Sequence, residues 1–226
     1  MSELAGAVVL VAGASGGLGR ILAAQLEAAG AVVVRAGRSA DRLQGPDAYL
    51  ADLRERTGGA SLVAAALQAH GHLDGVIVAA GVVAFGPVAE LDDDVLDELF
   101  ETNALGPIRL IRAAHPALKA SAAGGGKPFV LTLSGVVAES PTAGMAAYSA
   151  SKAALAAFLS ATSREFRRDG IRAVDARPGH TETHLSEHPL AGAAPSFPPG
   201  LAPEAVASRI VRALVDDEKD LPSSAF

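Results

Sequence analysis

Short runs of apolar residues alternate with longer, mixed stretches along this chain. Five of the short runs are rich in Val, Ile or Leu and lack apolar–polar alternation, which is typical of strands covered on both faces of a sheet. The predicted strands are Ala7–Ala12, Ala31–Ala36, Val76–Ala80, Phe129–Ser134 and Ile171–Ala176. The mixed stretches predict helices at Leu18–Ala29, Ser61–His70, Asp92–Ala120, Ser149–Asp169 and Pro203–Asp217. Alternating strands and helices predict an α/β fold in which helices cover both faces of a parallel sheet.

The segment before the last predicted helix has a different composition. Residues 185–203 contain five prolines together with Gly, Ala, Ser and His. Long loops in compact domains tend to be either lids or disordered segments. We therefore expect a substrate lid at about residues 184–202.

Composition narrows the class of protein. Half of the 226 residues are apolar, which is typical of a globular chain, and no apolar run is long enough to cross a bilayer. The net charge of -6, without a block of basic residues, argues against nucleic acid as a partner. The absence of cysteine excludes disulfides and thiolate metal sites. With no secretory signal in the sequence, we expect a cytoplasmic protein that uses neither membrane nor nucleic acid.

The first predicted strand runs directly into a glycine-rich turn. Gly13, Gly17 and Gly19 fall between this strand and the following helix. Glycine lets a backbone approach a ligand closely, and a helix N-terminus offers free N–H groups to a phosphate. These features favour a dinucleotide site. The spacing differs from the usual G-x-G-x-x-G fingerprint, so a glycine-rich turn without a ligand remains the alternative.

The end of the second predicted strand bears on the choice of cofactor. NAD sites usually place an acidic residue here, whereas this chain has Gly37-Arg38. An arginine suits a 2′-phosphate because it carries several donors and a permanent charge. We therefore favour NADP over NAD, with an incidental surface arginine as the alternative for Arg38. Arg20 could assist or could simply be solvated.

Tyr148 and Lys152 lie four residues apart in a predicted helix, so they share one face. An ammonium beside a phenol favours the phenolate and should lower the pKa of Tyr148 from its ordinary value near 10. The tyrosine would then serve as an acid or base near neutral pH. The alternative is an amphipathic helix with two incidental polar groups.

Together, the motifs resemble those of the short-chain dehydrogenase/reductase family in order along the chain. They are Gly13-x-x-x-Gly17-x-Gly19, Ala79-Ala80-Gly81, Asn103, Tyr148-x-x-x-Lys152 and Pro178-Gly179-x-x-x-Thr183. The resemblance extends over nearly the whole chain. It implies one Rossmann-type domain over residues 1–226, a doubly wound seven-stranded parallel sheet, and an NAD(P) cofactor.

The resemblance also implies residue roles. Tyr148 would donate or accept the proton, Lys152 would bind the nicotinamide ribose and tune Tyr148, and Asn103 would hold a water in the proton relay. Asp52 would contact the adenine. The cofactor-binding residues would be Gly13, Ser15, Gly17, Leu18, Gly19, Arg38, Asp52, Leu53, Ala79, Ala80, Gly81, Tyr148, Lys152, Pro178, Gly179, Thr181 and Thr183.

The chain departs from the family pattern at its substrate-binding serine. Alignment through Tyr148 places that serine at Gly135, and Ser134 lies one residue earlier. One step along a strand turns a side chain to the opposite face. Ser134 is the candidate catalytic serine, and it would serve only if the strand end bulges or the loop shifts. Ser140 is a poorer candidate.

Two smaller departures concern the family's Asn-Ala-Gly stretch and its C-terminus. Ala79 replaces the asparagine of that stretch. The C-terminal residues lack the glycine-rich last strand that many family members use in tetramers. Small alanines stud the helix that begins near Ser149, where family dimers often pair. We therefore expect a homodimer, with a tetramer as the alternative.

His180, His184 and His188 recur at intervals of four. On one helix they would share a face, and histidine is a common metal ligand. The preceding Pro178-Gly179 instead places them in the cofactor loop and lid, so we expect no metal. Asp92, Asp93 and Asp94 should begin a helix, where acids complement the dipole. We expect His70, His72 and His115 at the surface or at helix ends.

These observations favour an NADP(H)-dependent carbonyl reductase that acts on a small carbonyl compound or alcohol. The cofactor would supply the hydride and Tyr148 the proton. The alternative is a catalytically weak or inactive nucleotide sensor or scaffold on the same fold, because fold does not fix function.

Overall fold

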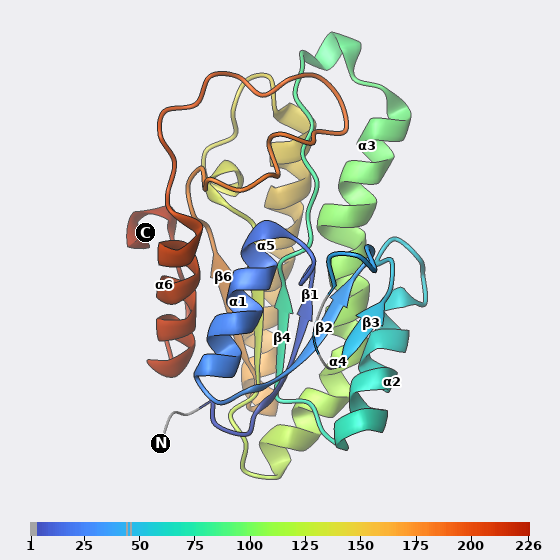
Figure 1. Ribbon diagram of the computed structural model, residues 1–226, viewed down its shortest axis with the longest axis vertical. Helices are drawn as coiled ribbons and strands as arrows, with labels where there is room; N and C mark the ends of the chain where they lie inside the picture. Colours follow the sequence, from blue (N-terminus) through green and yellow to red (C-terminus); the bar gives the residue numbers. More distant parts are fainter. Residues whose placement is uncertain (1–3, 44, 46) are drawn as a thin grey trace.

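The computed structural model describes residues 4–43, 45 and 47–226. Six parallel strands form one sheet in the order β3-β2-β1-β4-β5-β6 (Figure 1). The strands are β1 (Val8–Ala12), β2 (Val32–Gly37), β3 (Ala48–Leu50), β4 (Gly75–Val78), β5 (Phe129–Leu133) and β6 (Arg172–Ala176). The order reverses between β1 and β4, where open parallel sheets bind their ligands beyond the strand ends.

Six α-helices connect or follow the strands. They are α1 (Gly17–Ala28), α2 (Gly58–His70), α3 (Asp93–Phe100), α4 (Gly106–Ala123), α5 (Ala146–Phe166) and α6 (Pro203–Val215). Shorter turns are η1 (Val88–Glu90), the π-helical η2 (Glu101–Leu105), η3 (Val136–Ala138), η4 (Arg167–Asp169) and η5 (Ser223–Ala225). The predicted doubly wound α/β fold is confirmed. No helix among the described residues has the length and apolar content that a membrane span requires.

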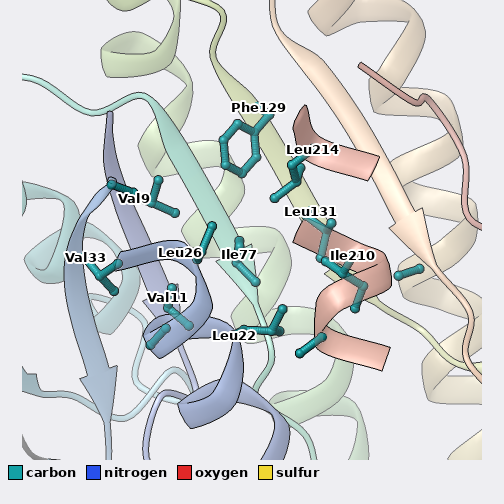
Figure 2. Close-up of a cluster of buried hydrophobic side chains, with 14 of the residues drawn as sticks. Val9, Val11, Leu22, Leu26, Val33, Ile77, Phe129, Leu131, Ile210 and Leu214 are labelled. Atoms are coloured by element: carbon teal, nitrogen blue, oxygen red, sulfur yellow. The ribbon is translucent and has the colours of Figure 1, made fainter. Parts of the chain in front are cut away.

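Helices cover both faces of the sheet. One face packs against α1 and α6, with Val9 and Val11 contributed by β1 (Figure 2). The other face packs against α2, α4 and α5, and there β1 contributes Val8 and Leu10. Both sets of alternate side chains are therefore buried, which explains why the strand sequence is apolar without interruption.

The sheet differs from the prediction at both edges. The edge strand β3 has only three residues, and Leu50 is exposed there, so no apolar run marks it in the sequence. At the opposite edge, the implied seventh strand is wrong for the described residues. Only an isolated parallel bridge joins Leu221 to Ala176 at that position. The short C-terminal segment provides no further ladder.

The predicted helix Asp92–Ala120 is divided into three parts: α3, η2 and α4. Asp92 caps α3 by accepting a hydrogen bond of 2.8 Å from the Asp94 amide, which confirms the predicted helix start. A π-helical turn then separates the two α-helices, as often occurs at functional sites. Gly106 is the first residue of α4. A side chain is excluded at this position because a Cβ would lie 2.7 Å from the Leu53 carbonyl oxygen.

The carboxyl ends of the strands point toward the long segment that joins β6 to α6 (Figure 1). This segment is tied to the chain after β4 by two backbone hydrogen bonds. The Phe85 amide donates to the Ala191 carbonyl at 2.9 Å, and the Leu190 amide donates to the Val83 carbonyl at 2.8 Å. The expected lid region therefore lies against the strand ends, beside the start of α5.

Candidate active site

A groove of about 1300 Å³ runs along the carboxyl ends of the central strands. Its walls come from the β1–α1 turn, the segments after β2 and β4, the first turns of α5, and the chain between residues 178 and 188. All seventeen residues predicted to bind the cofactor line this groove. Segments far apart in the sequence thus meet at one site.

Backbone geometry shapes the β1–α1 turn. Gly13 adopts a φ of 91°, and a Cβ there would lie 2.7 Å from the Ala80 Cα, so glycine is required for both conformation and packing. Gly16 precedes α1 without a side-chain cap. The first amides of α1 therefore remain available to an anion in the groove. This turn fits a pyrophosphate.

Arginines gather at the β2 end of the groove, where Arg20, Arg38 and Arg42 are lining residues. The Arg38 side chain is 48% exposed, and within the part of the chain that the structure describes its one ionic partner is Glu98, at 3.9 Å. Asp52 also lines this end, but its carboxylate accepts hydrogen bonds of 2.7–3.1 Å from the Arg54 side chain. The arginine side chains therefore bring positive charge to this end of the groove.

Thr102 was not predicted, because nothing in its sequence context singles it out. It is buried and lines the groove, yet its hydroxyl has no hydrogen-bond partner among the described residues. A buried polar atom normally has a partner. A bound ligand atom or water could satisfy this hydroxyl. The uncapped N-terminus of α1 lines the same groove, and on this ground the residues present fit a dinucleotide.

Tyr148 and Lys152 lie in the first two turns of α5, which begins three residues before the predicted start. Both side chains are buried, and the Lys152 ammonium lies 5.9 Å from the centre of the Tyr148 ring. Burial raises the pKa of Tyr148 to about 12 and lowers that of Lys152 to about 8. The predicted lowering of the Tyr148 pKa is therefore not seen. Desolvation of the phenol outweighs an ammonium at this distance.

Lys152 is held by contacts with neighbouring strands. Its Nζ donates a hydrogen bond of 2.8 Å to the Leu133 carbonyl. A Cβ at Gly81 would lie 3.2 Å from Lys152 Nζ and 3.3 Å from Asn103 Oδ1. The structure thus brings Lys152, Asn103 and Gly81 together.

The Asn103 side chain, in η2, is hydrogen-bonded to the backbone of the chain after β4. Its Oδ1 accepts from the Val82 amide at 2.9 Å, and its Nδ2 donates to the Val82 carbonyl at 2.9 Å and to Ser151 Oγ at 3.0 Å. Both amide hydrogens are used. Asn103 is not among the groove-lining residues, so its part in a proton relay stays a prediction.

Ser134 follows the last residue of β5, and its side chain is 0% exposed. Its hydroxyl donates a hydrogen bond of 2.6 Å to Asp175 Oδ2, so its only hydrogen is already used. Gly135 adopts a φ of 76°, and a Cβ there would meet only the Pro178 carbonyl oxygen, at 3.7 Å. The strand end therefore leaves the position of the family serine without a donor side chain.

The three histidines of the lid region do not lie on a shared helix, because the chain from 177 to 202 contains none. The His180 ring stacks on Phe197 with centroids 4.5 Å apart. His184 Nδ1 pairs with Glu187 Oε2 at 2.7 Å, on the surface. Among the described residues, no group of three or more His, Asp and Glu side chains is arranged to hold a metal.

The remaining histidines lie where the sequence predicts them. His70 is the last residue of α2, and the His72 side chain is 53% exposed. His115 is partly exposed within α4 and pairs with Asp169 at 2.7 Å.

Comparison with known protein families gives one match over most of the chain. The model described as short chain dehydrogenase matches residues 7–191. Among curated proteins, "Dehydrogenase/reductase SDR family protein 7-like" of Anopheles gambiae is 30% identical, with 97% of this chain and 75% of that protein covered. An uncharacterised oxidoreductase of Staphylococcus haemolyticus is 29% identical, with 95% and 93% covered.

Solved structures share the fold over nearly the full chain. A short chain dehydrogenase from Burkholderia cenocepacia, in complex with NADP, is 25% identical with a TM-score of 0.83, and the match covers 98% of this chain and 89% of that one. A short-chain dehydrogenase from Streptomyces avermitilis is 27% identical with a TM-score of 0.84, covering 98% and 90%.

Proposed function

Because the chain belongs to the short-chain dehydrogenase/reductase family of oxidoreductases, we propose that it is an NADP(H)-dependent enzyme that interconverts a small carbonyl compound and its alcohol. The observation that carries this proposal is the buried pair Tyr148 and Lys152 at the wall of a groove lined by all the predicted cofactor residues. A phenol and an ammonium at a dinucleotide site can handle the proton that accompanies hydride transfer.

The residues that would hold the cofactor come from both halves of the sheet. The β1–α1 turn would bind the pyrophosphate, and Pro178, Gly179, Thr181 and Thr183 would frame the nicotinamide. Arg38 supports NADP, because its exposed guanidinium lies in the groove among other arginines. When bound, the nicotinamide supplies or accepts the hydride.

The chain's own residues would manage the proton. With its pKa raised to about 12, Tyr148 stays protonated at neutral pH and can donate from its hydroxyl to the oxygen of the substrate. Lys152, with a pKa of about 8, is charged at neutral pH and stabilises the negative charge that develops beside it. Reduction is therefore the direction that these protonation states favour.

A side cavity with largely apolar walls is an argument for an apolar substrate. It has a volume of about 160 Å³ and shares Phe85, Met145 and Tyr148 with the main groove. Its other apolar walls include Val95 and Leu99 of α3, and its charged lining residues are the acidic Glu90 and Asp92. A neutral aldehyde or ketone with a compact apolar group suits this cavity better than a carboxylate does.

A second function, a nucleotide sensor, has one observation in its favour. Gly135 stands where the family has its substrate-binding serine, and the Ser134 hydroxyl is bonded to Asp175. A sensor would bind NADPH without turnover.

The test is to follow NADPH consumption by the purified protein against a panel of neutral aldehydes, aryl ketones and quinones, and to identify the alcohol formed. NADPH affinity is measured in parallel. We expect turnover with neutral apolar carbonyls and less with matched keto acids. Tight NADPH binding without turnover across the panel would instead favour the sensor.

A further inference from the structure

Only two charged side chains are buried among the residues that the structure describes: Lys152, 5% exposed, and Asp175, 7% exposed. They lie on neighbouring elements, α5 and β6, which pack against each other. Asp175 has no part in the proton transfer described above. A buried carboxylate is costly unless it is paired and hydrogen-bonded, so its presence needs a reason.

Three donors hold the Asp175 carboxylate: two lie at the end of β5, and the third lies just beyond β6. Thr132, its direct neighbour in the sheet register, donates to Oδ1 at 2.7 Å. Ser134 donates to Oδ2 at 2.6 Å, and Arg177 Nη1 donates to the same oxygen at 3.1 Å. Both carboxylate oxygens of this buried group therefore have hydrogen-bond donors.

The same end of β5 also holds Lys152. The Lys152 ammonium donates to the carbonyl of Leu133, the residue between the two hydroxyl donors. Residues 132–134 therefore fix both buried charges through alternate groups: two side chains bind the carboxylate, and the carbonyl between them binds the ammonium.

Arg177 does not cancel the negative charge of Asp175. Its guanidinium also pairs with Asp220 at 2.8 Å and with Glu139, so one cation is shared by three carboxylates. The cluster keeps a net negative charge on the β6 side of Lys152. Tyr148, on α5 itself, is neutral below its pKa of about 12, and Asn103 on η2 is uncharged.

We propose that Asp175 is a positioning residue that keeps the Lys152 ammonium charged and in place beside Tyr148. Burial alone lowers the pKa of Lys152, and the Asp175 carboxylate opposes that effect. This inference rests on the proposed function only in that a charged Lys152 is taken to assist proton transfer by Tyr148. The electrostatic link can be tested on the protein without substrate.

The chain suits a direct titration because it has four lysines, and the other three are exposed: Lys119, Lys127 and Lys219. Protein carrying ¹³C-labelled lysine is titrated by NMR, with Asp175→Asn compared with wild type. We expect the pKa of Lys152 to fall by about one unit or more in the variant. The matched control is Asp220→Asn, which removes a charge from the outer end of the cluster and should leave the Lys152 pKa within about 0.3 unit.

A Lys152 pKa that is the same in Asp175→Asn and wild type would overturn the proposal. If Asp175→Asn does not fold, wild-type protein labelled with ¹³C at the aspartate carboxyls still tests the proposal: the Asp175 resonance must shift with the same midpoint as Lys152. No movement at that midpoint would contradict the link. Because neither titration involves turnover, an inactive protein that shows the coupling would overturn the proposed function and leave this inference intact.

Discussion

The β1–α1 turn and the segment after β5 line the same groove, and each contains a glycine with positive φ. At Gly13 the backbone of Ala80 occupies the space that a Cβ would need. At Gly135 a Cβ would have room, because its nearest neighbour would be the Pro178 carbonyl oxygen at 3.7 Å. The first region lines the groove with glycine-rich backbone at the uncapped start of α1. In the second, the hydroxyl of Ser134 turns inward to a buried carboxylate.

This difference separates two ways of making a site. A site made of backbone groups depends on glycine positions and on the turn from strand to helix, and both can be recognised in a short stretch of sequence. A side-chain site depends on where one strand end directs its residues, and a one-residue step changes that direction. The cofactor half of the groove is therefore more firmly specified than the half that would hold the substrate oxygen.

Alanine at the two glycines should give the largest contrast. Gly13→Ala combines an unfavourable φ with backbone overlap, and we expect a loss of about 3 kcal/mol or more in the free energy of unfolding. Gly135→Ala has the unfavourable φ without the overlap, and should cost about 1 kcal/mol. Urea denaturation measures both. Equal losses would contradict the contrast in packing.

Charge reversal at Arg38 tests the adenosine end of the backbone region. Arg38→Asp should reduce the preference for NADPH over NADH by about 100-fold, because a charge-assisted contact is lost and a repulsion is gained. Titration with both cofactors measures the ratio of dissociation constants. Arg168→Asp provides a control for general loss of positive charge, since Arg168 is exposed and does not line the groove. An unchanged ratio in Arg38→Asp would remove this residue from cofactor selection.

The pH dependence of reduction tests the side-chain region. Lys152 has a pKa of about 8, lowered from 10.5 by burial, so its charge is present below about pH 8 and is lost above it. Tyr148, at about 12, stays protonated over this range. We expect kcat/KM for reduction to be level below about pH 7 and to fall above about pH 8. A profile that rises through pH 8 would show that a deprotonated group drives reduction.

Ser134→Ala should have the smallest effect. A donor aimed at the reacting oxygen contributes roughly 100- to 1000-fold in rate. Because the Ser134 hydroxyl donates to Asp175, we expect a loss in kcat of less than about tenfold, arising indirectly through the carboxylate. A 100-fold loss with unchanged NADPH affinity would place the hydroxyl on the substrate after all.

Much of the backbone could be predicted from the sequence because burial on both faces leaves its mark on central strands. All five apolar runs became strands, and no strand end differs from its predicted position by more than two residues. The edge strand β3 has no such mark, since its side chains are partly or fully exposed. The break between α3 and α4 had one usable signal, Gly106-Pro107, because proline is favoured at the first positions of a helix.

The polar interior was harder to predict. The sequence carries one signal for Asp175: a carboxylate within a buried strand must find donors. Its donors, however, come from β5 and from beyond β6, and only the strand register brings them together. Burial of Tyr148, which reverses the expected direction of its pKa shift, likewise depends on tertiary packing.

The most direct test of the central claim compares wild type with Tyr148→Phe, measuring NADPH affinity and NADPH turnover on the same preparations. Removing one hydroxyl should leave the affinity within about threefold and reduce turnover by roughly 100- to 10,000-fold, the range for loss of a general acid. Turnover that persists unchanged in Tyr148→Phe would contradict the account, because the proton would then come from another group.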